Sequence, residues 1–179
     1  MTKHKEYELV KNRFILGELS EFRDIFRHLP KSRVAEDLGI GKARFTGYIE
    51  NPDGFAIRKL MEFAKDCDLS IIDLGQMIET QQPVITKSDS PRKGTYKAIG
   101  LKIKNGEIHT LGDFLDRVAD YKIAEDLGRK ADTIKRFLDQ VENFQVKDLR
   151  TLASLCEVSL LTMFKLVEAQ YVIQLHKQT

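Results

Sequence analysis

The chain has 179 residues, 42% of them hydrophobic and 31% charged, and its formal net charge is +2. This composition is typical of one or two small globular domains and excludes an intrinsically disordered chain. The sequence contains neither an apolar run near the roughly 18 residues of a membrane span nor an apolar signal-peptide core at its N-terminus. We therefore expect a cytoplasmic protein, and the small net charge is only a weak indication of a nucleic-acid partner.

The first part of the chain is predicted to form short helices. Residues 7–18 give no clear signal, but the apolar residues from Phe22 to Leu29 then recur at spacings of three and four, which is typical of a helix. Pro30 interrupts this pattern. Because proline suits the first turn of a helix, a second helix is predicted at 31–38.

A tight turn and a third helix are predicted next. Gly39 supplies the positive φ that ends the helix at 31–38. The following helix is predicted at 42–50, because Phe45 and Ile49 then share one face that points to the core.

Two further helices complete this part of the chain. The sequence Asn-Pro-Asp-Gly at 51–54 predicts a turn. A fourth helix carries the apolar residues from Ile57 to Cys67, and Ser70 with Asp73 forms a capping-box-like start for a fifth. No segment from about residue 20 onward needs to be a strand, so the sequence predicts an all-α domain of about five helices.

An internal repeat links the two halves of the chain. Val-Ala-Glu-Asp-Leu-Gly at 34–39 returns as Ile-Ala-Glu-Asp-Leu-Gly at 123–128, a shift of 89 residues. Held without gaps over positions 7–81, this shift gives 16 identities in 75 positions, where average composition predicts about 4 or 5 by chance. Cys67 and Cys156 fall on matched positions, and we expect both in the core without a disulfide.

The repeat predicts three parts in the chain. Residues 1–81 form a first domain, residues 82–95 a flexible basic linker, and residues 96–179 a second domain. In the second domain, residues 98–110 could form a short β-hairpin, because Asn105-Gly106 is a favoured hairpin turn.

Positive charge gathers around the linker. Residues 81–105 carry six Lys or Arg against one Asp, a net +5, whereas residues 1–80 sum to −1 and residues 106–179 to −2. The basic segment is either a solvated linker or a stretch that lies along DNA phosphates. Its cationic residues are Lys87, Arg92, Lys93, Lys97, Lys102 and Lys104.

The C-terminal helix differs from its counterpart in the first copy. Residues 160–175 are apolar on more than one face, and such a helix is normally buried. Its end, with Tyr171, Val172 and Leu175, could pack against the first copy or against a second chain. We favour a homodimer, because this helix offers more apolar surface than one small domain normally covers.

The segment from Lys31 to Glu50, KSRVAEDLGIGKARFTGYIE, resembles the phage-repressor-like helix-turn-helix family, also called lambda-repressor-like or XRE. It has a small Ala35 where two helices cross, and Gly39 at the turn. The resemblance extends to the helix order and to the Leu-x-x-Phe-Ala pattern of the fourth helix. It covers residues 19–79 and 108–168 and implies two tandem helix-turn-helix domains, each of about five helices.

The resemblance implies a DNA-reading surface on the first copy, since the second helix of the motif enters the major groove in this family. On a helical wheel of residues 42–50, small side chains point away from the core and permit close approach to base edges. The start of the preceding helix offers backbone N–H groups and positive charge to phosphate. The candidate residues are Lys31, Ser32, Arg33, Lys42, Ala43, Arg44, Thr46 and Gly47.

The second copy departs from this pattern. The outer face of its helix at 131–139 carries Asp132 and Asp139, and its first motif helix opens with Asp120. Carboxylates are unfavourable in a phosphate-lined groove unless they accept a hydrogen bond from cytosine. The candidate DNA-binding residues in this copy are Lys122, Arg129, Lys130, Lys135 and Arg136.

These patterns favour a DNA-binding protein and transcriptional regulator, with double-stranded DNA as partner. The alternative is a protein-interaction or assembly module that keeps the fold without base readout, which the low net charge and the acidic second copy favour. An enzyme is not expected, because the four histidines are scattered without metal-ligand spacing and no phosphate-binding glycine loop is present. No cofactor or metal is predicted.

Overall fold

In the computed structural model, described here for residues 3–85 and 90–176, helices are the only regular secondary structure apart from one isolated antiparallel bridge between Ala56 and Gln145. The prediction of an all-α protein is therefore confirmed. None of the described helices is long and apolar enough to cross a membrane.

The helices of the first half follow the predicted order. The predicted helix at 42–50 has the same bounds in the structure, and Ser70 and Asp73 form the predicted capping box. The segment after Glu21 is a 3-10 helix and not an α-helix. The elements are α1 (Lys3–Ile15), η1 (Phe22–Arg27), α2 (Lys31–Asp37), α3 (Lys42–Glu50), η2 (Pro52–Gly54), α4 (Ile57–Asp66) and α5 (Ile71–Gln81).

The second half repeats this order. Helices α8 and α9 begin and end 89 residues after α2 and α3, and η3 is displaced from η2 by the same interval. The last helix, α11, is longer than α5. The elements are α6 (Lys93–Lys104), α7 (Leu111–Leu115), α8 (Asp120–Asp126), α9 (Ala131–Asp139), η3 (Val141–Asn143), α10 (Val146–Cys156) and α11 (Leu160–His176).

The predicted hairpin at 98–110 is wrong, because its first half, up to Lys104, belongs to helix α6. Tyr96, Ile99 and Ile103 are buried on one face of the helix at spacings of three and four. Gly106, with φ 71°, ends the helix in the left-handed conformation, and the amide of Glu107 donates to the carbonyl of Lys102 at 2.9 Å. The Asn-Gly pair therefore serves as a helix C-cap and not as a hairpin turn.

The first helix of each half is tied to the repeated motif by a buried tyrosine. The Tyr7 hydroxyl donates to Asp37 at 2.6 Å, and the Tyr96 hydroxyl donates to Asp126 at 2.8 Å. Burial and the neighbouring carboxylate raise the pKa of both phenols. The aspartate of each Ala-Glu-Asp-Leu-Gly motif thus anchors α1 to α2 and α6 to α8.

Both cysteines lie in the core, as predicted. Cys67 and Cys156 are buried and free, and burial raises the pKa of both thiols, that of Cys156 to about 12. They belong to one hydrophobic cluster that runs through both halves.

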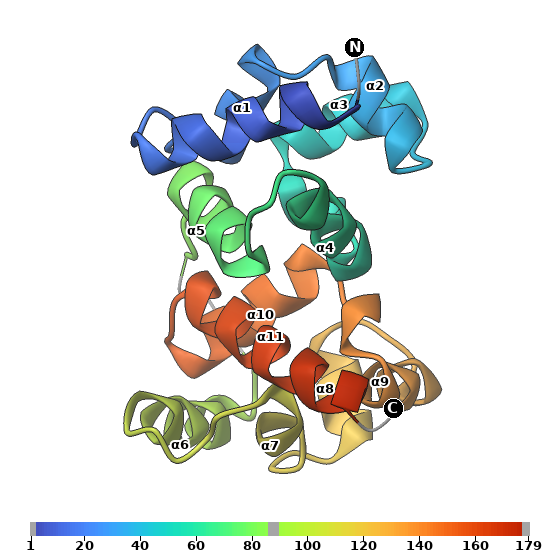
Figure 1. Ribbon diagram of the computed structural model, residues 1–179. Helices are drawn as coiled ribbons and strands as arrows, with labels where there is room; N and C mark the ends of the chain where they lie inside the picture. The colour runs from blue at the N-terminus through green and yellow to red at the C-terminus, as the bar shows by residue number, and fades with distance from the viewer. Residues whose placement is uncertain (1–2, 86–89, 177–179) are drawn as a thin grey trace.

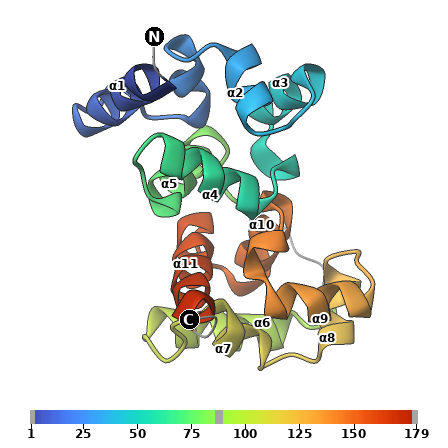
Figure 2. The ribbon, with the colours of Figure 1, turned by 45° about the vertical axis from the view of Figure 1, so that its right-hand side comes forward.

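The two halves pack against each other (Figures 1 and 2), and residues at equivalent positions of the repeat make backbone hydrogen bonds between them. The amide of Ile57 donates to the carbonyl of Phe144 at 2.8 Å, and the amide of Val146 donates to that of Phe55 at 3.0 Å. Because each bond is the other shifted by the repeat, the halves are related by an approximate two-fold axis through the bridge.

Helices α5 and α11 cross at the same axis. Gly75 lies against the ring of Phe164, its counterpart 89 residues on, and a Cβ at Gly75 would lie 2.6 Å from that ring. The Glu79 carboxylate accepts from the amides of Leu160 and Leu161 at the start of α11, at 2.9 and 3.1 Å. The N-terminal part of α11 therefore packs against the first half of its own chain.

The predicted flexible linker at 82–95 needs correction. Helix α6 begins at Lys93, inside the predicted range. The guanidinium of Arg150, on α10, donates a hydrogen bond to the carbonyl of Gln82. Lys87 lies outside the described residues. The halves are placed by the α5–α11 contact and the bridge, so the reach of a free linker does not set their spacing.

Candidate nucleic-acid interface

A few local features fix how helix α3 follows helix α2 in the first half. Gly39 has φ 63°, and the amide of Ile40 donates to the carbonyl of Ala35 at 2.8 Å, which closes the end of α2. Ala35, Phe45 and Ile49 are buried between the two helices. This packing fixes α3 and leaves its opposite face to solvent.

The exposed face of α3 has the residues that the sequence predicted for it. Lys42, Ala43, Arg44, Thr46 and Gly47 are all exposed, and the Thr46 hydroxyl donates to the carbonyl of Lys42 at 3.0 Å. A Cβ at Gly47 would meet nothing within 4 Å. Within the described parts of the chain, neither Lys42 nor Arg44 has an ion-pair partner, so both cations remain free to bind an anion.

The start of α2 is less available than predicted. Lys31 and Ser32 are exposed, but the guanidinium of Arg33 pairs with Glu6 of α1 at 2.9 Å. The amide of Arg33 donates to the carbonyl of Pro30 at 3.1 Å, so it is not free for phosphate. Lys31 is the one predicted cation here that no described carboxylate neutralises.

In the second half, three predicted cations lie on the equivalent surface. Lys130, Lys135 and Arg136 are exposed around α9, and the Arg136 Nε donates to the carbonyl of Asp132 at 3.4 Å. Asp132 and Asp139 are exposed on the same helix. This surface therefore carries carboxylates at both ends of the helix, whereas α3 carries an exposed carboxylate only at its last residue, Glu50.

Arg129 is not on this surface, contrary to the prediction. Its Nη2 pairs with the Asp148 carboxylate at 3.0 Å and donates to Gln145 Oε1 at 2.7 Å. The Asp148 side chain is only 2% exposed, and a buried carboxylate requires a charged partner.

The repeat contained a signal for this pair. The position of Arg129 is Ile40 in the first half, and that of Asp148 is Lys59. From the first copy to the second, the apolar Ile40 is thus replaced by Arg129 and Lys59 by Asp148. A new cation together with a new anion is the pattern expected of an ion pair within the second copy.

Lys122 is half-buried, and its Nζ lies 5.9 Å from the centre of the Tyr121 ring. Tyr121 is 62% exposed and replaces Ser32 of the first half. Sequence reasoning missed this aromatic residue, which flanks the second motif at a position where the first copy has a small hydroxyl.

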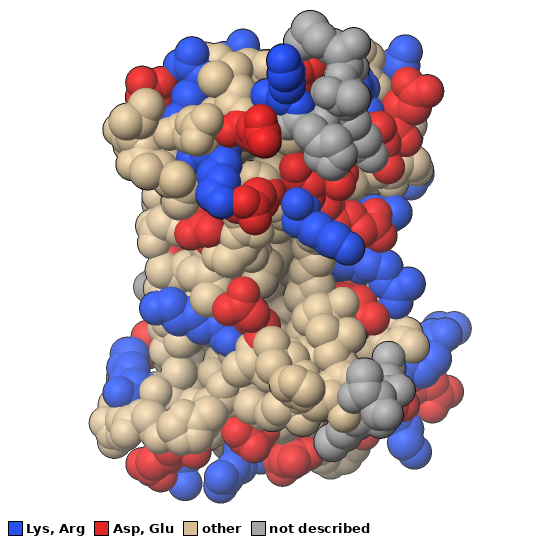
Figure 3. All heavy atoms as spheres, viewed as in Figure 1, with Lys and Arg blue, Asp and Glu red and all other residues tan. Residues whose placement is uncertain are grey.

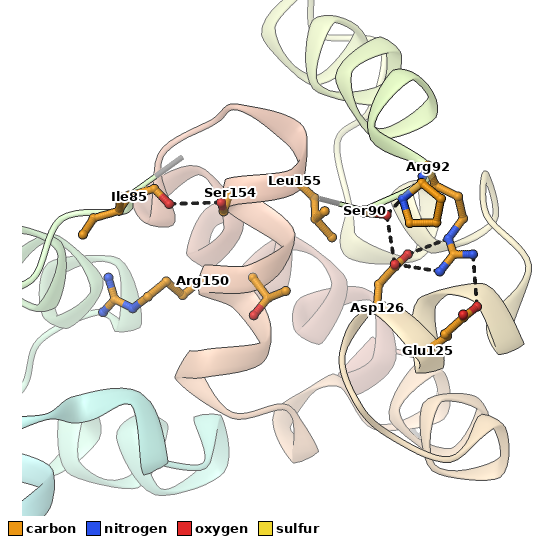
Figure 4. A pocket seen from close by; sticks show the side chains of 10 residues that line it. Ile85, Ser90, Arg92, Glu125, Asp126, Arg150, Ser154 and Leu155 are labelled. Atoms are coloured by element: carbon orange, nitrogen blue, oxygen red, sulfur yellow. Dashed lines mark hydrogen bonds and ion pairs between the residues drawn. The ribbon is translucent and has the colours of Figure 1, made fainter. Parts of the chain in front are cut away.

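Part of the basic segment near the linker is neutralised by neighbouring carboxylates (Figure 4). Arg92 pairs with Asp126 at 2.7 Å and with Glu125 at 3.1 Å, beside a cavity of about 530 Å3 between α8 and α10. Burial acts to raise the pKa of Asp126, but hydrogen bonds from Arg92, Tyr96 and Ser90 lower it below its ordinary value. Lys97 pairs with Glu157 at 3.4 Å. Arg92 therefore joins the linker to the motif and is not free for phosphate.

Helices α3 and α9 lie towards the same side of the molecule in both ribbon views, one in each half (Figures 1 and 2). The described residues contain no cluster of three or more metal-binding side chains. Comparison with family models, curated proteins and solved structures gives no match to this chain.

Proposed function

We propose that the chain is a tandem pair of repressor-like helix-turn-helix domains, derived by internal duplication, that binds double-stranded DNA as a transcriptional regulator. The observation that carries this proposal is the outer face of α3. It combines two free cations, Lys42 and Arg44, with three small residues on a rigidly packed helix.

The chemistry of this face suits the major groove. The groove is about 12 Å wide and admits one helix, and small side chains let the backbone approach the base edges. Ala43 and Gly47 provide that approach, and the Thr46 hydroxyl and methyl can meet a base. Lys42 and Arg44 reach guanine or phosphate from its margins.

The second half contributes a different reading surface. Lys135 and Arg136 replace Thr46 and Gly47, and Asp132 replaces Ala43. Its carboxylates can accept hydrogen bonds from the amino group of cytosine or of adenine in the groove, and they repel phosphate elsewhere. Because an approximate two-fold axis relates the halves, one chain would bind two unlike half-sites in inverted orientation, with α3 supplying most of the base readout.

The second candidate function is a protein-interaction or assembly module without base readout. The acidic residues on α9 and the formal net charge of only +2 favour it. The two candidates differ in whether the protein selects one duplex sequence over another.

Selection from a random-sequence duplex library, followed by fluorescence anisotropy on the enriched duplex, tests the proposal. We expect one enriched site with two unlike inverted halves, their centres about 34–36 Å apart as in dimeric relatives of this geometry. Affinity should fall steeply with salt. A library that yields no enriched sequence would refute base readout and favour the assembly module.

A further inference from the structure

A groove runs between α4 and the end of α11. It consists of two adjoining hollows of about 430 and 410 Å3 that share Met61, Lys65 and Tyr171. Met61, Leu69 and Tyr171 give it apolar walls, and all three are only half-buried. Apolar grooves of this kind commonly bind the apolar face of an amphipathic helix.

The end of α11 is an apolar ridge beside the groove. Val172 and Leu175 line one hollow and are each 45% exposed, and Ile173 is 40% exposed. In the space-filling view the middle of this face is uncharged where α5 meets α11, and side chains of both charges lie on the side of α4 (Figure 3). Exposed apolar surface of this kind marks an interaction site.

The equivalent surface in the other half is covered by the chain itself. On α10, the Arg150 guanidinium donates a hydrogen bond to the carbonyl of Gln82, and the Ser154 hydroxyl donates one to the carbonyl of Ile85 at 3.1 Å. Residues 82–85 therefore lie along α10. The corresponding residues 171–174 stay within α11. The repeat therefore leaves α4 without the cover that α10 has within the described chain.

Charges of both signs line the groove, and four of its charged residues already have partners: Arg58 pairs with Glu142, Glu62 with Lys59 and Asp68 with Lys11. Lys65 stands on α4 and Glu168 on α11, and neither has an ion-pair partner in the described ranges. Glu168 is half-buried, and burial together with the nearby Asp73 raises the pKa of its carboxyl. A cation brought to Glu168 would relieve this cost.

We propose that a second copy of this chain docks in the groove, with the ends of the two α11 helices crossing about a two-fold axis. Ridge and groove lie side by side, so one rotation places Val172 and Leu175 of each chain in the groove of the other. The same rotation brings Lys65 of one chain to Glu168 of its partner, in both directions. The contact continues the α5–α11 interface, since Ile71 lines the groove and packs in the core.

This proposal does not rest on DNA binding, because the groove lies on α4 and α11 and the reading surface on α3 and α9. Dimerisation and duplex selection therefore fail or succeed separately. The surface of one helix end and one groove is small, so the dimer should dissociate in the micromolar range.

Charge reversal tests the pairing by sedimentation equilibrium between about 1 and 200 µM of the full chain. We expect the wild type to dimerise and the single variants Lys65→Glu and Glu168→Lys to raise the dissociation constant by about tenfold or more. The variant with both reversals should regain the wild-type value within about threefold, because the pair is restored with its sign exchanged. Lys104→Glu, on α6 away from the groove, is the matched control and should change nothing.

A second variant, Leu175→Glu, places a charge on the ridge and should give a monomer with an unchanged circular dichroism spectrum. A wild type that remains monomeric at the highest concentration overturns the proposal and favours a different partner for the groove. Single reversals that leave the dissociation constant unchanged, or a double reversal that does not recover it, also overturn the proposed contact.

Discussion

The assignment of Arg129 to the protein interior, and not to DNA, makes a quantitative prediction. Arg129→Met leaves Asp148 without its cation, and the Asp148 side chain is 2% exposed. Removing one partner of a buried ion pair costs about 3–5 kcal/mol. Asp148 still accepts a hydrogen bond from the amide of Gln145 at 2.9 Å and the site is open at the Arg129 end, so we expect a loss smaller than this range, of about 2–3 kcal/mol.

The assay is urea unfolding at neutral pH, with thermal unfolding as a second measurement. For a chain of this size the expected loss corresponds to a fall in Tm of about 4–12 °C. The first half supplies a designed rescue, because Ile40 and Lys59 occupy the positions of Arg129 and Asp148. Arg129→Ile combined with Asp148→Lys should recover stability to within about 1 kcal/mol of the wild type.

Two results would refute this reasoning. Unchanged stability in Arg129→Met would mean that Asp148 does not need its partner. Unchanged stability together with a large loss of duplex affinity would return Arg129 to the DNA surface.

Three further variants or conditions test the fold. Gly100→Ala should destabilise the protein by about 1–3 kcal/mol in urea unfolding, because the new Cβ meets the backbone carbonyl of Cys156. Gly47→Ala faces open space and should stabilise α3 by about 0.5–1 kcal/mol. Equal effects of the two substitutions would contradict the packing of α6 on α10. Cys67 and Cys156 should not react with a thiol reagent at pH 8 until the chain is unfolded, since both are buried and the pKa of Cys156 is raised to about 12; fast labelling of the native protein would disprove their burial. The pKa of Asp126 is lowered in the folded state, so its contribution to stability is present above the unfolded pKa of about 3.9 and is lost as the pH falls through the folded pKa. Asp126→Asn should therefore reduce the loss of stability at acid pH. An unchanged loss of stability at acid pH would argue against the Arg92–Tyr96–Asp126 cluster.

Much of the helical order could be predicted from the sequence, because local signals decide it. The helix at 42–50 and the capping box at Ser70 depend on apolar spacing and on one side-chain hydrogen bond within four residues. The repeat then predicted the same order for the second half. The hairpin prediction failed because Asn-Gly suits both a hairpin turn and a helix C-cap, and only packing of α6 against α10 distinguishes them.

The arrangement of the halves could not be predicted in the same way. It depends on contacts between residues far apart in the chain, such as Gly75 with Phe164 and Glu79 with the start of α11. The same holds for Arg129, whose charge suggested DNA but whose partner lies on α10. The exposed cations of α3 were predicted correctly because a helical wheel needs only the core positions of that helix.

The most direct test of the proposed function is the salt dependence of duplex binding by the wild type and by the variant Lys42→Ala with Arg44→Ala. On the enriched duplex, each phosphate contact contributes about 0.9 to the slope of log affinity against log salt, and each base contact about 1–3 kcal/mol. We predict that the double variant binds at least about tenfold more weakly, with a slope lower by up to about 2, while Lys165→Ala on α11 binds as the wild type does. A double variant with wild-type affinity and slope would contradict DNA reading by α3.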